Sequence, residues 1–184
     1  MDKVTVANSA LLKLGASPIS DIDEDSDNGR RIRACFDRLN DEVTGAYPWK
    51  HALKRTSLYA LAEAPAFEFT KQMDLPSDCL HVLEVYPDGT DFTIEDHKLL
   101  CDQEEIQVKY IRRNTPSSNW ENAFCEALAW RIAMELCYAI NNSSERLDAC
   151  TKAYKAQLAD ARFLNARQAS VKVLVSDQWT QARR

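Results

Sequence analysis

The residues best suited to chemistry are the carboxylates of an acidic segment, DIDEDSD, at positions 21–27. Carboxylates at alternate positions are ligands of an EF-hand loop, which also needs Gly at its sixth position and a bidentate Glu at its twelfth. Counted from Asp21, those positions hold Ser26 and Ile32, and the register that starts two residues later fails as well. Two interpretations remain: a weak surface cation site, or a solvated loop whose charge favours the start of the following helix.

Histidine and cysteine could supply a metal site or a nucleophile. The three histidines, His51, His81 and His97, lie far apart, and none has a carboxylate or a cysteine at a diagnostic spacing. The cysteines form no C-x-x-C pair and stand at no zinc-finger spacing with histidine. We interpret them as small buried hydrophobic residues in a reducing compartment. They are Cys35, Cys79, Cys101, Cys125, Cys137 and Cys150.

The common catalytic and phosphate-binding motifs are missing from the sequence. It contains no G-x-S-x-G, no H-E-x-x-H and no dinucleotide fingerprint, and Gly accounts for only 4 of 184 residues. Close backbone approach to a phosphate generally uses glycine. We therefore predict no metal, no cofactor and no catalytic residues. A small soluble enzyme whose site is not visible in the sequence stays open as an alternative.

Charge and hydropathy narrow the class of protein further. Lys and Arg number 23 against 28 Asp and Glu, which gives a net charge of −5 and a pI near 5.3. An acidic chain is poorly suited to coat nucleic acid through phosphate neutralisation. Hydrophobic residues make up 45%, too many for disorder, and the length allows one domain or one domain with a large insertion. No signal peptide is evident.

Helical patterns occupy the first part of the chain. Val4, Ala7 and Leu11 repeat at helical spacing up to Gly15, which suits the left-handed position that ends a helix. A second helix is predicted from about residue 29 to residue 45, between two further glycines.

Two more helices are predicted after residue 117. Ser118 and Glu121 have the spacing of a capping box, and the apolar helix that follows, to about Ile140, should pack on several faces. Three charges and a length below 20 residues argue against a membrane span. The sequence Asn-Asn-Ser-Ser at 141–144 predicts a break, after which a last helix runs to about Ala169.

The middle of the chain predicts β structure. Ile106, Val108 and Tyr110 alternate with polar residues, as in a half-buried strand. Short polar connections favour an antiparallel meander over βαβ units. Strands are expected at 66–69, 80–86, 92–95, 99–101 and 105–112. The predicted fold class is α+β, with a helical bundle of residues 1–50 and 118–169, a small inserted antiparallel β domain of residues 51–117, and an extended C-terminal tail of residues 170–184.

Three features of this arrangement are candidates for contacts. Tyr47-Pro48-Trp49 should form a hydrophobic plug where the second helix meets the β region. The tail is apolar and has no turn to fold it back, so it should dock either on its own domain or on a partner, for example by strand addition. The arginines of the second helix either pair with acids on a solvated face or contact another subunit. These are Arg30, Arg31, Arg33 and Arg38.

Several short motifs follow one another in a specific order along residues 4–167. They are ANSALLKLG at 7–15 with the acidic loop behind it, YPW at 47–49, LPSDCL at 75–80, VKYI at 108–111 and the Ala- and Leu-rich helix after Trp120. Tyr154, Leu158, Ala161-Arg162 and Ala166-Arg167 complete the series. In this order and spacing the chain resembles the head–tail adaptor proteins of short-tailed bacteriophages, also called tail tubular protein A. One departure is His51 before Ala52, where the family pattern has an aromatic residue.

The resemblance implies a fold, a role and a set of partners. Such proteins have a helical bundle with a β domain inserted in the middle, and they form a ring, typically of twelve copies, beneath the portal. The ring joins the portal protein to the tail nozzle protein and lines the channel through which DNA leaves without specific binding. The protein would be made in the host cytoplasm and reside in the virion, at the head–tail junction, with no membrane partner.

The resemblance also assigns the tail to the portal. The candidate portal-binding residues are Val171, Val173, Leu174, Val175, Trp179, Arg183 and Arg184, and the four arginines of the second helix are candidates for subunit contacts. The alternative of the same class is a neck or head-completion protein of a long-tailed phage.

Overall fold

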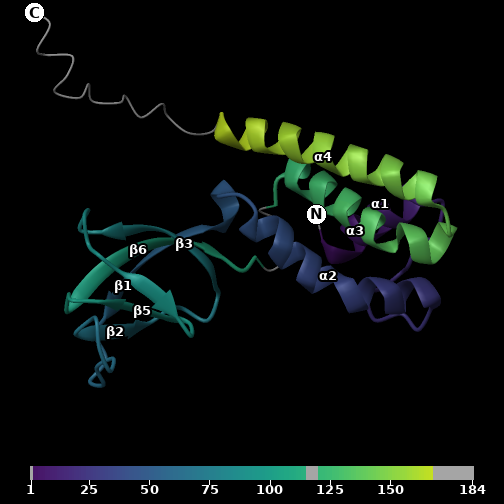
Figure 1. Ribbon diagram of the computed structural model, residues 1–184. Coiled ribbons are helices and arrows are strands. Elements are labelled where there is room, and N and C mark those ends of the chain that lie inside the picture. Colours follow the sequence, from purple (N-terminus) through teal and green to yellow (C-terminus); the bar gives the residue numbers. More distant parts are fainter. Residues whose placement is uncertain (1, 115–119, 168–184) are drawn as a thin grey trace, which may run out of the picture.

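The computed structural model describes residues 2–114 and 120–167, and this part of the chain is an α+β protein (Figure 1). The fold class is therefore confirmed at this level. Helices stand at both ends of the described chain, and all strands lie between α2 and α3. The helices are α1 Lys3–Lys13, α2 Asp27–Gly45, α3 Asn122–Asn141 and α4 Ser144–Ala166, with a short 3-10 turn, η1, at Lys50–Ala52. The strands are β1 Leu53–Tyr59, β2 Lys71–Asp74, β3 Cys79–Tyr86, β4 Thr93–Glu95, β5 Lys98–Cys101 and β6 Glu105–Arg112.

Polar side chains begin three of the helices. The Oδ1 of Asp2 accepts a hydrogen bond from the Thr5 amide at 2.8 Å, and Ser26 and Ser143 cap α2 and α4 in the same way. Such caps satisfy amides that have no partner inside the helix. Gly15, with φ of +69°, follows the end of α1 as predicted, because a left-handed residue there costs little without a Cβ.

The predicted capping box at the start of α3 is wrong. Glu121 has extended backbone (φ −69°, ψ 140°) and stands directly before the helix, whereas a capping box would place it at the third helical position. Its neighbour Trp120 is buried and meets Phe124 edge to face at 5.2 Å. The buried indole anchors the chain just before α3 to the helical cluster. Ser118 lies outside the described residues.

The six strands form two antiparallel sheets, with strand orders β1-β6-β3 and β2-β5-β4. A simple meander is therefore wrong, because the last strand, β6, lies between β1 and β3, and only β4 and β5 pair as chain neighbours within a sheet. The strand expected at 66–69 is also wrong: this segment is irregular, Glu68 has φ of +76°, and pairing begins at Lys71. Strand β1 was not predicted, since its LKRTSLY sequence does not alternate cleanly.

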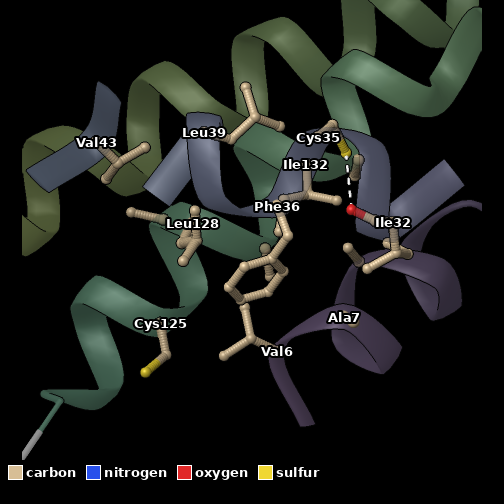
Figure 2. Packing of buried hydrophobic residues seen from close by; sticks show 14 of the residues in the cluster. Val6, Ala7, Ile32, Cys35, Phe36, Leu39, Val43, Cys125, Leu128 and Ile132 are labelled. Carbon is tan, nitrogen blue, oxygen red and sulfur yellow. Dashed lines mark hydrogen bonds between the residues drawn. The ribbon is translucent and has the colours of Figure 1, made fainter. Parts of the chain in front are cut away.

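Two hydrophobic clusters hold these elements together. The helical cluster joins all four helices; in Figure 2, Phe36 of α2 lies among Val6 of α1 and Leu128 and Ile132 of α3. The sheet cluster lies between the two sheets and includes Met73, Leu99, Ile106 and Val108. Strand β6 serves both, because its Ile111 belongs to the helical cluster. The strands lie at one end of the molecule and the helices at the other (Figure 1).

The helix α3 is buried on several faces, as its sequence predicts. Ten of its residues are buried, among them Arg131, which is only 8% exposed. Within residues 2–114 and 120–167, no helix is both long and apolar enough to cross a membrane. Five of the cysteines are buried and Cys79 is half-buried, and all six are free thiols, which fits their interpretation as small hydrophobic residues.

Candidate functional site

The acidic segment at 21–27 is held by the arginines that follow it. The guanidinium of Arg30 donates to Asp25 at 2.5 Å and to Asp27 at 2.6 Å, and Arg33 faces Asp23 at 3.6 Å. All of these side chains are largely exposed. Exposed pairs of this kind add little stability, so they neutralise the segment without fixing a binding site.

The remaining polar groups of the segment make local contacts. Glu24 accepts hydrogen bonds from the amide and the hydroxyl of Ser20, at 2.7 and 2.8 Å, and these bonds hold the pKa of Glu24 below its usual range. Asp21 accepts from the amide two residues later, and Arg31 donates to Asn28 at 3.3 Å. In the described part of the chain, no group of three or more potential metal ligands comes together.

Arg38 belongs to a different arrangement, the α2–α3 ion network, formed by Arg38, Glu42, Arg131 and Glu135. Arg131 donates to both carboxylate oxygens of Glu42, at 2.8 and 3.0 Å, and to Glu135 at 3.0 Å. Arg38 donates to the other oxygen of Glu135 at 2.5 Å. Hydrogen bonds from Arg131 and then Arg38 hold the pKa of Glu135 below its usual range, although partial burial works in the opposite direction. The network fixes α2 against α3.

The junction between α2 and β1 is a cluster of aromatic rings. Trp49 is fully buried and its indole N–H donates to the Val43 carbonyl at 2.8 Å. Tyr47 meets Trp49 edge to face at 5.1 Å, and Phe124 of α3 lies 5.2 Å from Trp49 and 4.7 Å from the His51 ring. The predicted hydrophobic plug is therefore confirmed, and His51 takes an aromatic place in it.

The three histidines lie on different elements. His51 is in η1, where burial and then the charge of Arg112 lower its pKa to about 4. Neither of its buried ring nitrogens has a partner among the described residues. His81 lies on β3, and His97 lies in the β4–β5 turn, where its Nε2 is 3.0 Å from the Pro76 carbonyl. The fold does not gather them into one site.

A groove of about 400 Å³ lies on the sheet β1-β6-β3. It is lined by Arg55, Tyr86, Gln107 and Lys109, among others, and includes no cysteine and no histidine. Glu84, at its edge, accepts from Lys109 at 2.6 Å and from the Tyr86 hydroxyl at 2.7 Å. Its carboxylate, through the hydrogen bond and its charge, raises the pKa of Tyr86. The groove therefore offers polar donors that are already held by Glu84.

Large hydrophobic side chains are exposed on both halves of the molecule. Single exposed hydrophobic residues are ordinary, whereas a set of large ones is typical of a surface that other molecules cover. The exposed large side chains are Leu12, Tyr59, Phe67, Leu83, Tyr86, Phe92, Ile94, Tyr138, Phe163 and Leu164.

The last turns of α4 combine anchored and exposed residues. The Arg162 guanidinium lies 5.6 Å above the Tyr47 ring, and Asn165, which is fully buried, accepts a hydrogen bond from the backbone of η1. Phe163 and Leu164 lie between these anchors and are 64% and 47% exposed. The end of α4 is thus fixed at the aromatic junction while two apolar side chains face outward.

The predicted portal-binding residues of the tail, 171, 173–175, 179, 183 and 184, lie outside the described residues. The structure describes the chain before them as far as Arg167, the residue that follows α4.

No protein-family model matches this chain, and the search of curated proteins also gave no match. The functional argument therefore rests on the residues and on their geometry. The described part of the chain is an α+β protein with ion-paired helices, an aromatic junction between α2 and β1, and exposed apolar side chains.

Proposed function

We propose that this protein is a structural head–tail adaptor of a bacteriophage. It forms a homo-oligomeric ring between the portal and the tail nozzle and lines the DNA exit channel. The order of its sequence motifs supports this proposal, and so does an architecture in which both sheets stand between α2 and α3 in the chain. In this proposal residues 1–50 and 118–169 form a helical bundle, residues 51–117 an inserted β domain, and residues 170–184 a docking tail.

The observation that carries the proposal is the exposed pair at the end of α4. Phe163 and Leu164 are 64% and 47% exposed, with the Arg167 guanidinium 5.8 Å from the Phe163 ring, although Asn165 next to them is fully buried. Because Arg162 and Asn165 fix α4 on both sides of these two residues, their side chains are held in one orientation. Such an arrangement suits a contact with another subunit or with the portal. The segment predicted to dock on the portal follows α4 in the chain, so this proposal assigns both the end of α4 and the tail to contacts with neighbouring proteins.

The charge of the chain fits passage of DNA. A net charge of −5 disfavours phosphate contacts, and the α2 arginines Arg30, Arg33 and Arg38 are paired with carboxylates of the same chain. Cations that are paired in this way would hold the duplex only weakly during ejection. The protein would be made in the host cytoplasm and act in the virion, without a membrane partner.

Deletion of the tail tests the proposal directly. The full chain and a chain lacking Ser170–Arg184 are each mixed with purified portal rings and followed by mass photometry. We expect the full chain to add multiple copies to each portal and the truncated chain to add none, while circular dichroism shows unchanged helix content. Equal loading of portals by both chains would refute the docking role of the tail, and no loading by the full chain would refute the adaptor role.

A further inference from the structure

Cys137 and Cys150 form a thiol pair between two packed helices. Cys137 lies in the last turns of α3 and Cys150 in the second turn of α4, and both line the same hollow between the helices. Both thiols are free. The turn between the helices is short, so the two cysteines face each other across a tight helical hairpin.

The pair opens onto a surface groove. Both cysteines line a hollow of about 430 Å³, together with Leu12, Trp130 and Arg146. Cys137 is fully buried, and Cys150 is 7% exposed, so Cys150 is the thiol that a small reagent reaches first. Arg146 lies one helical turn before Cys150, where its positive charge favours the thiolate.

The other cysteines have different surroundings. The Cys35 thiol donates to the Ile32 carbonyl at 3.6 Å, and the Cys101 thiol donates to the Gln103 carbonyl at 3.8 Å. Cys125 is 1% exposed, within the helical cluster. The combination of a neighbouring thiol and a groove to solvent thus distinguishes Cys137 and Cys150 from these three.

We propose that Cys137 and Cys150 are a redox modification site, which a peroxide converts into an intrachain disulfide that links α3 to α4. The Cys150 thiolate attacks the peroxide ROOH, which gives a sulfenic acid at Cys150 and ROH. Cys137 then attacks the Cys150 sulfur, the disulfide forms and water leaves. The two thiols lose two electrons and two protons in total, and the peroxide is reduced. A reducing cytosol keeps the pair as thiols, and an oxidising exterior allows the bond to form.

The surroundings of the pair also set the pH dependence of the reaction. Burial, and then the adjacent Cys137, raise the pKa of the Cys150 thiol to about 11. The thiolate is the reacting species, so the rate should rise about tenfold per pH unit below that pKa. The pair should be nearly inert at neutral pH over minutes and should react readily near pH 9.

Peptide mapping of the oxidised full chain tests the proposal. The chain is treated with hydrogen peroxide at pH 7 and at pH 9, remaining thiols are alkylated, and the digest is analysed by mass spectrometry. We expect a Cys137–Cys150 linked peptide, a decrease from six free thiols to four, and a rate about a hundredfold higher at pH 9. The linked helices should also unfold about 6 to 10 °C higher than the reduced protein.

Two variants separate this pair from general oxidation. Cys35→Ser removes a buried thiol and should leave the linked peptide unchanged. Cys137→Ser removes the second thiol, so Cys150 should accumulate as a sulfenic acid that dimedone traps. Disulfides that join other cysteines at equal yield, or sulfinic acids without any Cys137–Cys150 link in the wild-type chain, would overturn the proposal.

Discussion

The α2–α3 ion network allows the sharpest prediction about stability. Arg131 is 8% exposed, and it makes two hydrogen bonds to Glu42 and one to Glu135. Replacing it by Met keeps much of the buried volume but removes the closest cation of Glu42, so that Arg38 alone of the network's two arginines remains near both carboxylates. Breaking a fully buried pair costs about 3 to 5 kcal/mol. Because the Glu42 side chain is 45% exposed and that of Glu135 is 34% exposed, water relieves part of this, and we expect Arg131→Met to lower the free energy of unfolding by about 2 to 3 kcal/mol.

Urea unfolding followed by circular dichroism at pH 7 measures this difference. Arg30→Gln is the matched control, because it removes an arginine that pairs with two exposed carboxylates of α2 and the loop before it, and no measurable change is expected. A Glu42→Gln variant keeps the shape of the side chain and should lie between the two. If Arg131→Met shifts the urea midpoint no more than Arg30→Gln does, the network does not fix α2 against α3.

Three further predictions concern a histidine, a glycine and the end of α4. The pKa of His51 is lowered to about 4, below its unfolded value of about 6.5. The unfolded state thus binds the proton first, and stability that is complete above about pH 7 falls by about 3 kcal/mol as the pH drops towards 4. Acid unfolding monitored by tryptophan fluorescence checks this, and His51→Phe should flatten the profile between those pH values. Gly29→Ala would place a Cβ 2.3 Å from the Glu24 carbonyl oxygen, so its thermal unfolding should show a loss of about 1 to 3 kcal/mol; unchanged stability would mean that this turn shifts freely. Phe163→Ser combined with Leu164→Ser should leave the unfolding midpoint unchanged and reduce the mass of the assemblies that form on portal rings. Assemblies of full mass would show that these residues take no part in the contact.

Local signals predicted much of the fold. Gly15 and the Asn-Asn-Ser-Ser break mark helix ends that depend only on neighbouring residues, and both are found where expected. Strand β6 was predicted with its observed limits because Ile106, Val108 and Tyr110 alternate over its length. These features share one cause, which is that a few neighbouring residues determine the backbone conformation.

The features that the sequence did not predict depend on contacts between distant parts of the chain. Strand β6 pairs with β1 and β3, and such pairings cannot be read from the alternation of one strand. The residue before α3 is the extended Glu121, next to the buried Trp120, and not the serine of the predicted capping box. Likewise, the partner of Arg38 is Glu135 on another helix, so its sequence neighbourhood did not reveal the α2–α3 ion network.

The candidate site was predictable to a smaller extent. The aromatic plug at Trp49 followed from residue type and position. The exposure of Phe163 and Leu164 was not predictable. Helical periodicity indicates which residues can face the core, but it does not show which other apolar residues are exposed to solvent. The contact of Cys137 with Cys150 required the packing of α3 on α4.

Assembly into a ring on the portal is the central claim, and electron microscopy of the full chain bound to portal rings tests it most directly. The account predicts a closed ring with cyclic symmetry, coaxial with the portal, with an open central channel and with the exposed end of α4 at a contact. A chain that stays monomeric beside intact portals, or binds them as scattered single copies without a ring, would contradict it.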